Sequence, residues 1–146
     1  MQRWHTLAAH YNHKYGCRVQ KIPLDAGASC PNRDGTFSLA GCTFCNANGS
    51  GSGRAKRGHS LLQQWNALRA VYLRDDPNTR FIAYLQSFSN TYGPQKRLQQ
   101  LLQSVRSLPQ CFGVAVGTRP DCLDGPKLDI LAALDCDLWL ELGLQT

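Results

Sequence analysis

The sequence predicts an α/β fold built on a parallel sheet. Apolar segments of strand length alternate with amphipathic segments of helix length, and a Gly/Pro-rich loop separates the first strand from the next helix. Strands that alternate with helices in this way are joined by crossover connections, which make the sheet parallel. The 146 residues, 42% of them hydrophobic and 18% charged, suit one globular domain with a real core.

The first two elements are a short helix and a strand. Apolar and aromatic residues recur at helical spacing from Leu7 to Tyr15, and Gly16 is a typical helix stop. The helix therefore belongs to an N-terminal extension, residues 1–17. The segment RVQKIPLDAG, residues 18–27, predicts the first strand.

The second helix begins after a Gly/Ser-rich stretch. Ser60 is a good N-cap, and Gln63 completes a capping box. The apolar stripe that follows continues to DDPN, residues 75–78, which ends the helix. The compact apolar segment RFIAYLQSFS, residues 80–89, predicts the second strand.

The remaining elements continue the same alternation. Pro94 is expected as the first residue of a helix with a leucine-rich stripe. CFGVAVGT, residues 111–118, predicts a strand covered on both faces. A short helix over 124–135 and a fourth strand, DLWLELGLQT over 137–146, complete the pattern.

Polar and cysteine-rich segments follow or end the predicted strands. They are the cysteine loop, Gln86 with Ser87, GTRPD over 117–121, and ELGLQT over 141–146. Ligands of parallel sheets and barrels bind at the carboxyl ends of the strands. We therefore expect the functional groups to meet on one rim.

Three cysteines share the loop SCPNRDGTFSLAGCTFCN. Eleven residues separate Cys30 from Cys42, and two separate Cys42 from Cys45. A structural zinc site normally takes four protein ligands, and a cubane iron-sulfur cluster takes four thiolates. Three thiolates on a cluster would leave one iron open for another ligand. A zinc site would need a further ligand, for which the candidates are Cys17, His13 and His59.

The other cysteines and the N-terminus favour a reducing, cytoplasmic setting. The chain has an odd number of cysteines, seven, and shows neither a secretory signal nor an apolar run of membrane-spanning length. The four cysteines outside the loop are predicted to be buried small side chains: Cys17, Cys111, Cys122 and Cys136.

Positive charge is concentrated in the first half of the chain. Residues 1–74 carry ten Lys and Arg against two acidic residues, whereas residues 75–146 carry six against eight. Such a field attracts polyanions, so RNA is a possible partner. A solvated basic surface is the alternative, because basic and aromatic residues are not interleaved.

Four motifs together resemble one protein family. SCPNRDGTFSLAGCTFCNANGSGSG, FIAYLQSFSNTYGP, VGTRPDCL and LWLELGLQT closely resemble the YhcC-type, Elongator-catalytic-subunit-like branch of the radical S-adenosylmethionine (SAM) enzymes. The resemblance covers essentially the whole chain. The eleven-residue gap after Cys30 departs from the commonest signature of that superfamily, which has three residues there, but is the pattern of this branch.

The resemblance implies a cofactor set and a fold. Cys30, Cys42 and Cys45 would bind a [4Fe-4S] cluster whose fourth iron binds SAM, and reductive cleavage would give a 5′-deoxyadenosyl radical. An electron donor of the flavodoxin or ferredoxin type would serve as partner. The fold would be a partial (βα) TIM-like barrel, truncated after about three and a half βα units. We expect the chain to be the N-terminal part of one radical SAM core domain, a fragment, since a fourth strand left uncovered would be an unpaired apolar edge.

The resemblance also supplies candidate SAM contacts: Phe44, Gln86, Thr118, Arg119, Glu141 and Gln145. Each has a structural alternative. Phe44 would pack the loop onto the barrel, and Gln86 would be a surface polar group. Thr118 and Arg119 would hold their loop by local hydrogen bonds, and the Glu141–Gln145 pair would form a structural hydrogen bond within the barrel. NRDG, residues 32–35, is interpreted as loop scaffold, and NGSGSG, residues 48–53, as a ligand approach or a flexible connector.

The substrate and the substrate-acting catalytic residues are left unassigned. Two other functions stay open. One is a non-catalytic zinc module that contacts RNA through the basic half, and the other is an inactive truncated product.

Overall fold

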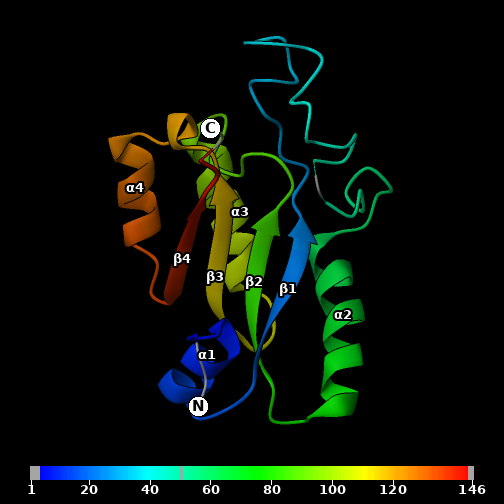
Figure 1. Ribbon diagram of the computed structural model, residues 1–146, viewed down its shortest axis with the longest axis vertical. Helices are drawn as coiled ribbons and strands as arrows, with labels where there is room; N and C mark the ends of the chain where they lie inside the picture. Colours follow the sequence, from blue (N-terminus) through cyan, green and yellow to red (C-terminus); the bar gives the residue numbers. More distant parts are fainter. Residues whose placement is uncertain (1–3, 50, 145–146) are drawn as a thin grey trace.

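Within residues 4–49 and 51–144, which the computed structural model describes, four parallel strands form one open sheet in the order β1-β2-β3-β4 (Figure 1). The strands are β1 (Val19–Asp25), β2 (Arg80–Gln86), β3 (Cys111–Thr118) and β4 (Asp137–Leu142). The predicted α/β fold with a parallel sheet is confirmed at this level, and each expected strand is present.

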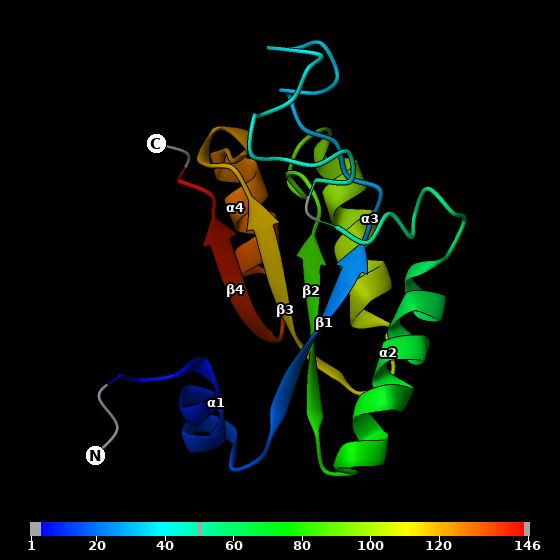
Figure 2. The ribbon, with the colours of Figure 1, turned by 45° about the vertical axis from the view of Figure 1, so that its right-hand side comes forward.

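Helices cover both faces of the sheet. Three follow strands and pack on one face: α2 (Leu61–Asp75), α3 (Gln95–Arg106) and α4 (Gly125–Ala132). The first helix, α1 (Leu7–Tyr15), lies at the opposite end of the sheet from the cysteine loop (Figure 2) and packs on the other face. A 3-10 turn, η1 (Pro120–Cys122), precedes α4. Among the described residues, no helix is both long and apolar enough to cross a membrane.

The helix ends follow the predicted capping chemistry with one exception. Gly16 ends α1 with φ 66°, and Ser60 and Gln63 form both hydrogen bonds of the capping box. Pro94, expected as the first helical residue, is instead the N-cap of α3: its ψ of 146° is extended, while its carbonyl already accepts a hydrogen bond from the Arg97 amide at 3.0 Å. The fixed φ of proline suits the N-cap as well as the first turn.

Three predicted strands are shorter than expected. β1 covers Val19–Asp25 of the expected 18–27. β2 stops at Gln86 because Ser87 and Phe88 have positive φ angles of 82° and 62°, which take the chain out of the sheet. β4 stops at Leu142.

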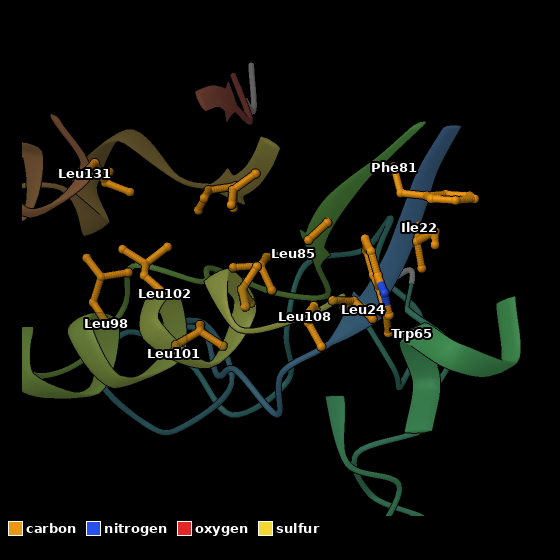
Figure 3. Packing of buried hydrophobic residues seen from close by; sticks show 14 residues of the cluster. Ile22, Leu24, Trp65, Phe81, Leu85, Leu98, Leu101, Leu102, Leu108 and Leu131 are labelled. Carbon is orange, nitrogen blue, oxygen red and sulfur yellow. The ribbon is translucent and has the colours of Figure 1, made fainter. Parts of the chain in front are cut away.

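The main core lies between the sheet and helices α2–α4. In the close view of Figure 3, leucines of α3 and Trp65 of α2 surround side chains of the strands. The Trp65 and Phe81 rings meet edge to face at 6.0 Å between centroids. Fully burying a large apolar side chain contributes ~1.5–3 kcal/mol. The core is built from these buried residues: Ile22, Leu24, Trp65, Phe81, Ala83, Leu85, Leu98, Leu101, Leu102, Val105, Leu108, Val114, Val116 and Leu131.

The opposite face, which we call the inner face, carries a smaller core beneath α1. Tyr11 of α1 is buried against Ile82 and Ala115, and its ring meets Trp139 edge to face at 5.4 Å. This cluster closes the inner face near the strand starts. The carboxyl half of the inner face, toward the cysteine loop, is lined by polar groups instead.

Candidate site at the carboxyl ends of the strands

The cysteine loop is fastened at both ends to one carboxylate. Asp25, the last residue of β1, is buried. Its Oδ1 accepts a hydrogen bond from the Gly27 amide at 3.1 Å, and its Oδ2 accepts one from the Ala55 amide at 3.2 Å. Gln64 of α2 adds two hydrogen bonds of 2.9 Å to the backbone of Asp25. The loop therefore leaves and returns to the sheet at a fixed point.

All three loop cysteines line one hollow of about 310 Å³, which we call the cysteine hollow. Cys30 is buried, Cys42 and Cys45 are half-buried, and all three are free thiols. The rest of its wall is formed by Asn32, Arg33, Phe44, Gly49, Phe88, Ser89 and Arg119. The structure thus brings the three predicted ligands to one place.

Hydrogen bonds of the NRDG segment fix the turn that carries Cys42 and Cys45. The Cys45 amide donates to the Cys42 carbonyl at 3.0 Å, and the Asn32 side-chain amide donates to Cys42 Sγ at 3.0 Å. The Arg33 guanidinium donates to the carbonyls of Cys45 and Asn46 at 3.1 and 2.6 Å. These contacts agree with the interpretation of NRDG as loop scaffold.

The donor set of the cysteine hollow fits a group held by three thiolates. In the part of the chain that the structure describes, no three Cys, His, Asp or Glu side chains are arranged to hold a metal ion, so the thiols line the wall without converging. Among the described residues that line it, the hollow also has no fourth side chain of these types. A closed zinc site needs four ligands, whereas a cluster with one open iron needs three.

A second cavity adjoins the hollow. This strand-end pocket of about 320 Å³ lies across the ends of β2, β3 and β4. It shares part of its wall, formed by Gly49, Phe88 and Arg119, with the cysteine hollow. The two cavities are therefore neighbours on the predicted rim.

Most of the predicted SAM contacts line these cavities. Gln86, Thr118 and Glu141 lie in the strand-end pocket, and Arg119 lies in the shared wall. The remaining two candidates are Phe44 and Gln145. Phe44 is 64% exposed and lines the cysteine hollow. Gln145 lies outside the described residues.

Thr118 and Arg119 are held by local hydrogen bonds. The Thr118 and Thr91 hydroxyls lie 2.7 Å apart, and Thr91 also donates to the Cys122 carbonyl at 2.7 Å. Arg119 forms a bidentate pair with Asp121, at 2.8 and 2.7 Å, whose hydrogen bonds raise the pKa of Arg119 and lower that of Asp121. These bonds orient both side chains at the rim.

Glu141 carries a negative charge into the strand-end pocket. Burial alone would raise the pKa of its carboxyl group, but hydrogen bonds from Lys21 and Tyr84 and the charge of Lys21 outweigh burial and lower that pKa. Lys21 of β1 forms an ion pair with Glu141. The carboxylate is therefore ionised at neutral pH.

An unusual turn after β2 forms the wall between the cavities. Ser87 and Phe88, both with positive φ, are followed by the fully buried Asn90. The Asn90 side-chain amide donates to the carbonyls of Leu85 and Gly117 at 3.1 Å each. Positive φ in residues other than glycine costs energy and occurs often at functional sites.

The glycine-rich stretch packs on this turn. A Cβ at Gly49 would lie 2.6 Å from the Phe88 ring, and one at Gly51 would overlap the Ser87 hydroxyl. The close approach of the Phe88 and Ser87 side chains therefore explains why glycine occupies both positions, and no ligand has to be invoked.

Sequence reasoning missed Lys21, Tyr84, Phe88 and Asn90. Lys21 gave a usable signal, since it is a charged residue in the interior of a strand, between Gln20 and the apolar Ile22. Asn90 gave none, because its role depends on two carbonyls from different strands. The prediction of buried cysteines outside the loop holds for Cys122, whereas Cys17, Cys111 and Cys136 are half-buried.

Comparisons with known proteins identify relatives in bacteria and an archaeon. The chain is 42% identical over 147 residues to the uncharacterized protein YtqA of Bacillus subtilis, covering 99% of this chain and 46% of YtqA. It is 38% identical over 136 residues to protein YhcC of Escherichia coli K12, covering 91% of this chain and 43% of YhcC. It is 30% identical to the uncharacterized protein MJ0486 of Methanocaldococcus jannaschii, covering 91% and 41%.

The chain therefore spans less than half the length of these curated relatives. No family model matches the chain. No solved structure matches it either.

Proposed function

We propose that the chain is part of a radical SAM enzyme that binds a [4Fe-4S] cluster through Cys30, Cys42 and Cys45. The observation that carries the proposal is the adjacency of the two cavities. One is lined by three thiols and by no fourth described ligand, and the other is lined by polar groups at the strand ends. A cluster with one open iron needs a second ligand beside it, and the strand-end pocket offers the space.

When bound, the cluster and SAM would supply reductive cleavage of SAM to methionine and a 5′-deoxyadenosyl radical. The protein's own residues bind and orient. Asn32 donates a hydrogen bond to the Cys42 sulfur, and Arg33 fixes the backbone of the Cys42–Cys45 turn. Glu141 offers an ionised acceptor for hydroxyl or ammonium groups of SAM, and Gln86 offers an amide.

We also propose that the open sheet is part of a (βα) barrel. The polar groups of the inner face support this proposal. In the register of the sheet, Tyr84 lies two residues beyond Ile82, the partner of Lys21, and the partner of Glu141, Gly117, lies two residues beyond Ala115, the partner of Tyr84. A staggered register of this kind is needed for a sheet to close into a barrel.

The experiment that tests the function is anaerobic reconstitution with iron and sulfide. We expect about four irons per chain and a broad absorption band near ~400 nm that changes on addition of SAM. Dithionite, standing in for a flavodoxin- or ferredoxin-type donor, should then release 5′-deoxyadenosine. Stoichiometric zinc without the band would contradict the proposal and favour the zinc module, whose contact with RNA would be tested next.

Cysteine variants test the ligand assignment. Cys30→Ala, Cys42→Ala and Cys45→Ala should each abolish cluster binding, because two thiolates cannot hold the cluster. Cys111→Ala is the matched control, since Cys111 is the first residue of β3 and does not line the hollow. Equal iron content in all four variants would refute the assignment.

Glu141→Gln tests the strand-end pocket. We expect SAM affinity to fall about tenfold or more while iron content stays unchanged, because a hydrogen bond to a charged group is replaced by a neutral one. Calorimetric titration of SAM into the reconstituted protein gives the affinity. An unchanged affinity would remove Glu141 from the site.

A further inference from the structure

The inner face carries a charged pair in an unusual place. Lys21 of β1 and Glu141 of β4 form an ion pair across two intervening strands, with side chains 20% and 38% exposed. The Lys21 ammonium also lies over the Tyr84 ring, 4.9 Å from its centroid. Removing such charges from water costs free energy unless they are paired, so an arrangement of this kind calls for a reason.

Gly117 of β3 lies beside this pair. It faces Glu141 in the register of β3 and β4, and it presents no side chain to the inner face. A Cβ there would lie 3.2 Å from the Leu85 carbonyl and 3.9 Å from the Tyr84 ring. A side chain at Gly117 would therefore be tight against the Leu85 carbonyl and in ordinary contact with the Tyr84 ring.

The three side chains have different access to the strand-end pocket. Tyr84 and Glu141 line it, whereas Lys21 does not. A ligand in the pocket can therefore contact the Glu141 carboxylate directly. Lys21 can affect that ligand only through its ion pair with Glu141. In the described part of the chain, Glu141 is the one carboxylate paired with Lys21.

We propose that Lys21 is a positioning residue of the strand-end pocket, which holds the Glu141 carboxylate charged and directed at hydroxyl or ammonium donors of a bound ligand. This inference rests on the proposed function, in which SAM is that ligand. Tyr84 supports the same carboxylate from β2.

The electrostatics of the cluster agree with this role. Burial, with hydrogen bonding to Glu141, raises the pKa of Tyr84 to about 12, so its hydroxyl remains a donor. From α1, Tyr11 has a pKa raised mainly by burial, with smaller contributions from Tyr15 and from the charge of Glu141. β3 contributes only Gly117 beside Glu141. Lys21 is thus the cation that offsets burial of the carboxylate, and without it burial would raise the pKa of Glu141.

The chain itself provides a direct test, because Glu141 is its only glutamate. Protein labelled with ¹³C at the glutamate carboxyl should give one side-chain carboxyl signal in NMR spectra. In the metal-free protein, we expect this signal to titrate at higher pH in Lys21→Met than in wild type. Lys21→Arg, which keeps the charge, should stay near wild type. A matched control is Lys96→Met, at an exposed lysine of α3. The same midpoint in Lys21→Met and wild type would overturn the proposal.

SAM affinity separates this proposal from the function on which it rests. In reconstituted protein, Lys21→Met should bind SAM more weakly than wild type, and the loss should grow as the pH falls from 8 to 6, while wild type changes little and Glu141→Gln is weak at both pH values. If Glu141→Gln weakens binding but Lys21→Met matches wild type at both pH values, the positioning role is refuted and the function stands. If wild type binds neither cluster nor SAM, both fail.

Discussion

At the scale of single residues, Asn90 holds the turn that separates the two cavities of the rim. It is fully buried, and its amide group bonds carbonyls at the ends of β2 and β3. Its backbone amide donates to the Gly117 carbonyl as well, at 3.1 Å. These bonds fix the turn in which Ser87 and Phe88 adopt positive φ, and hence the wall between the two cavities.

Asn90→Ala should lower the free energy of unfolding by about 1–3 kcal/mol, because two carbonyls lose a buried donor. Asn90→Asp should be more destabilising, since it adds a buried carboxylate that faces carbonyl oxygens. Urea denaturation followed by circular dichroism measures both. An aspartate variant as stable as wild type would contradict this account.

At the scale of elements, the cysteine loop is a unit fastened by Asp25. Asp25→Ala removes both acceptors that hold the amides of Gly27 and Ala55. We expect faster trypsin cleavage at the basic residues of segment 54–57, while the sheet remains folded. Asp25→Asn keeps one acceptor and should have a smaller effect.

The control for the loop prediction is Asp75→Ala, at an exposed carboxylate in the last turn of α2. Cleavage rates measured under native conditions report local opening of the loop. Equal rates in Asp25→Ala and Asp75→Ala would show that the carboxylate does not fasten the loop.

Elements were more predictable from the sequence than contacts between them. Strands and helices follow from local patterns, such as the stripe of α3 and the Ser60 capping box, which are contained in a few neighbouring residues. The end of β2 was missed because tertiary hydrogen bonds of Asn90 hold a turn that local preferences disfavour. The Lys21–Glu141 pair joins residues 120 apart and depends on the register of four strands.

At the scale of the whole molecule, the main core and the candidate site occupy different parts of the sheet: the core lies between the sheet and helices α2–α4, and the site lies at the carboxyl ends of the strands. Phe81, near the start of β2, is fully buried against Trp65 and Tyr72. Gln86, at the end of the same strand, lines the strand-end pocket. The core cluster therefore supports the rim without lining it.

Phe81→Leu should lower the free energy of unfolding by about 1–3 kcal/mol, because it leaves a gap beside Trp65. SAM affinity of the reconstituted, folded protein should stay within about twofold of wild type, since no pocket residue is touched. Chemical denaturation and calorimetric titration measure the two quantities. A loss of affinity as large as that expected for Glu141→Gln would show that core and rim are coupled.

The wall formed by Gly49, Phe88 and Arg119 has a consequence for how this molecule can change. Because both cavities share it, a substitution in this wall changes the shape of both. Any side chain at Gly49 displaces the Phe88 ring. Effects of paired substitutions across this wall should therefore be non-additive. The shapes of the two cavities are thus constrained to change together.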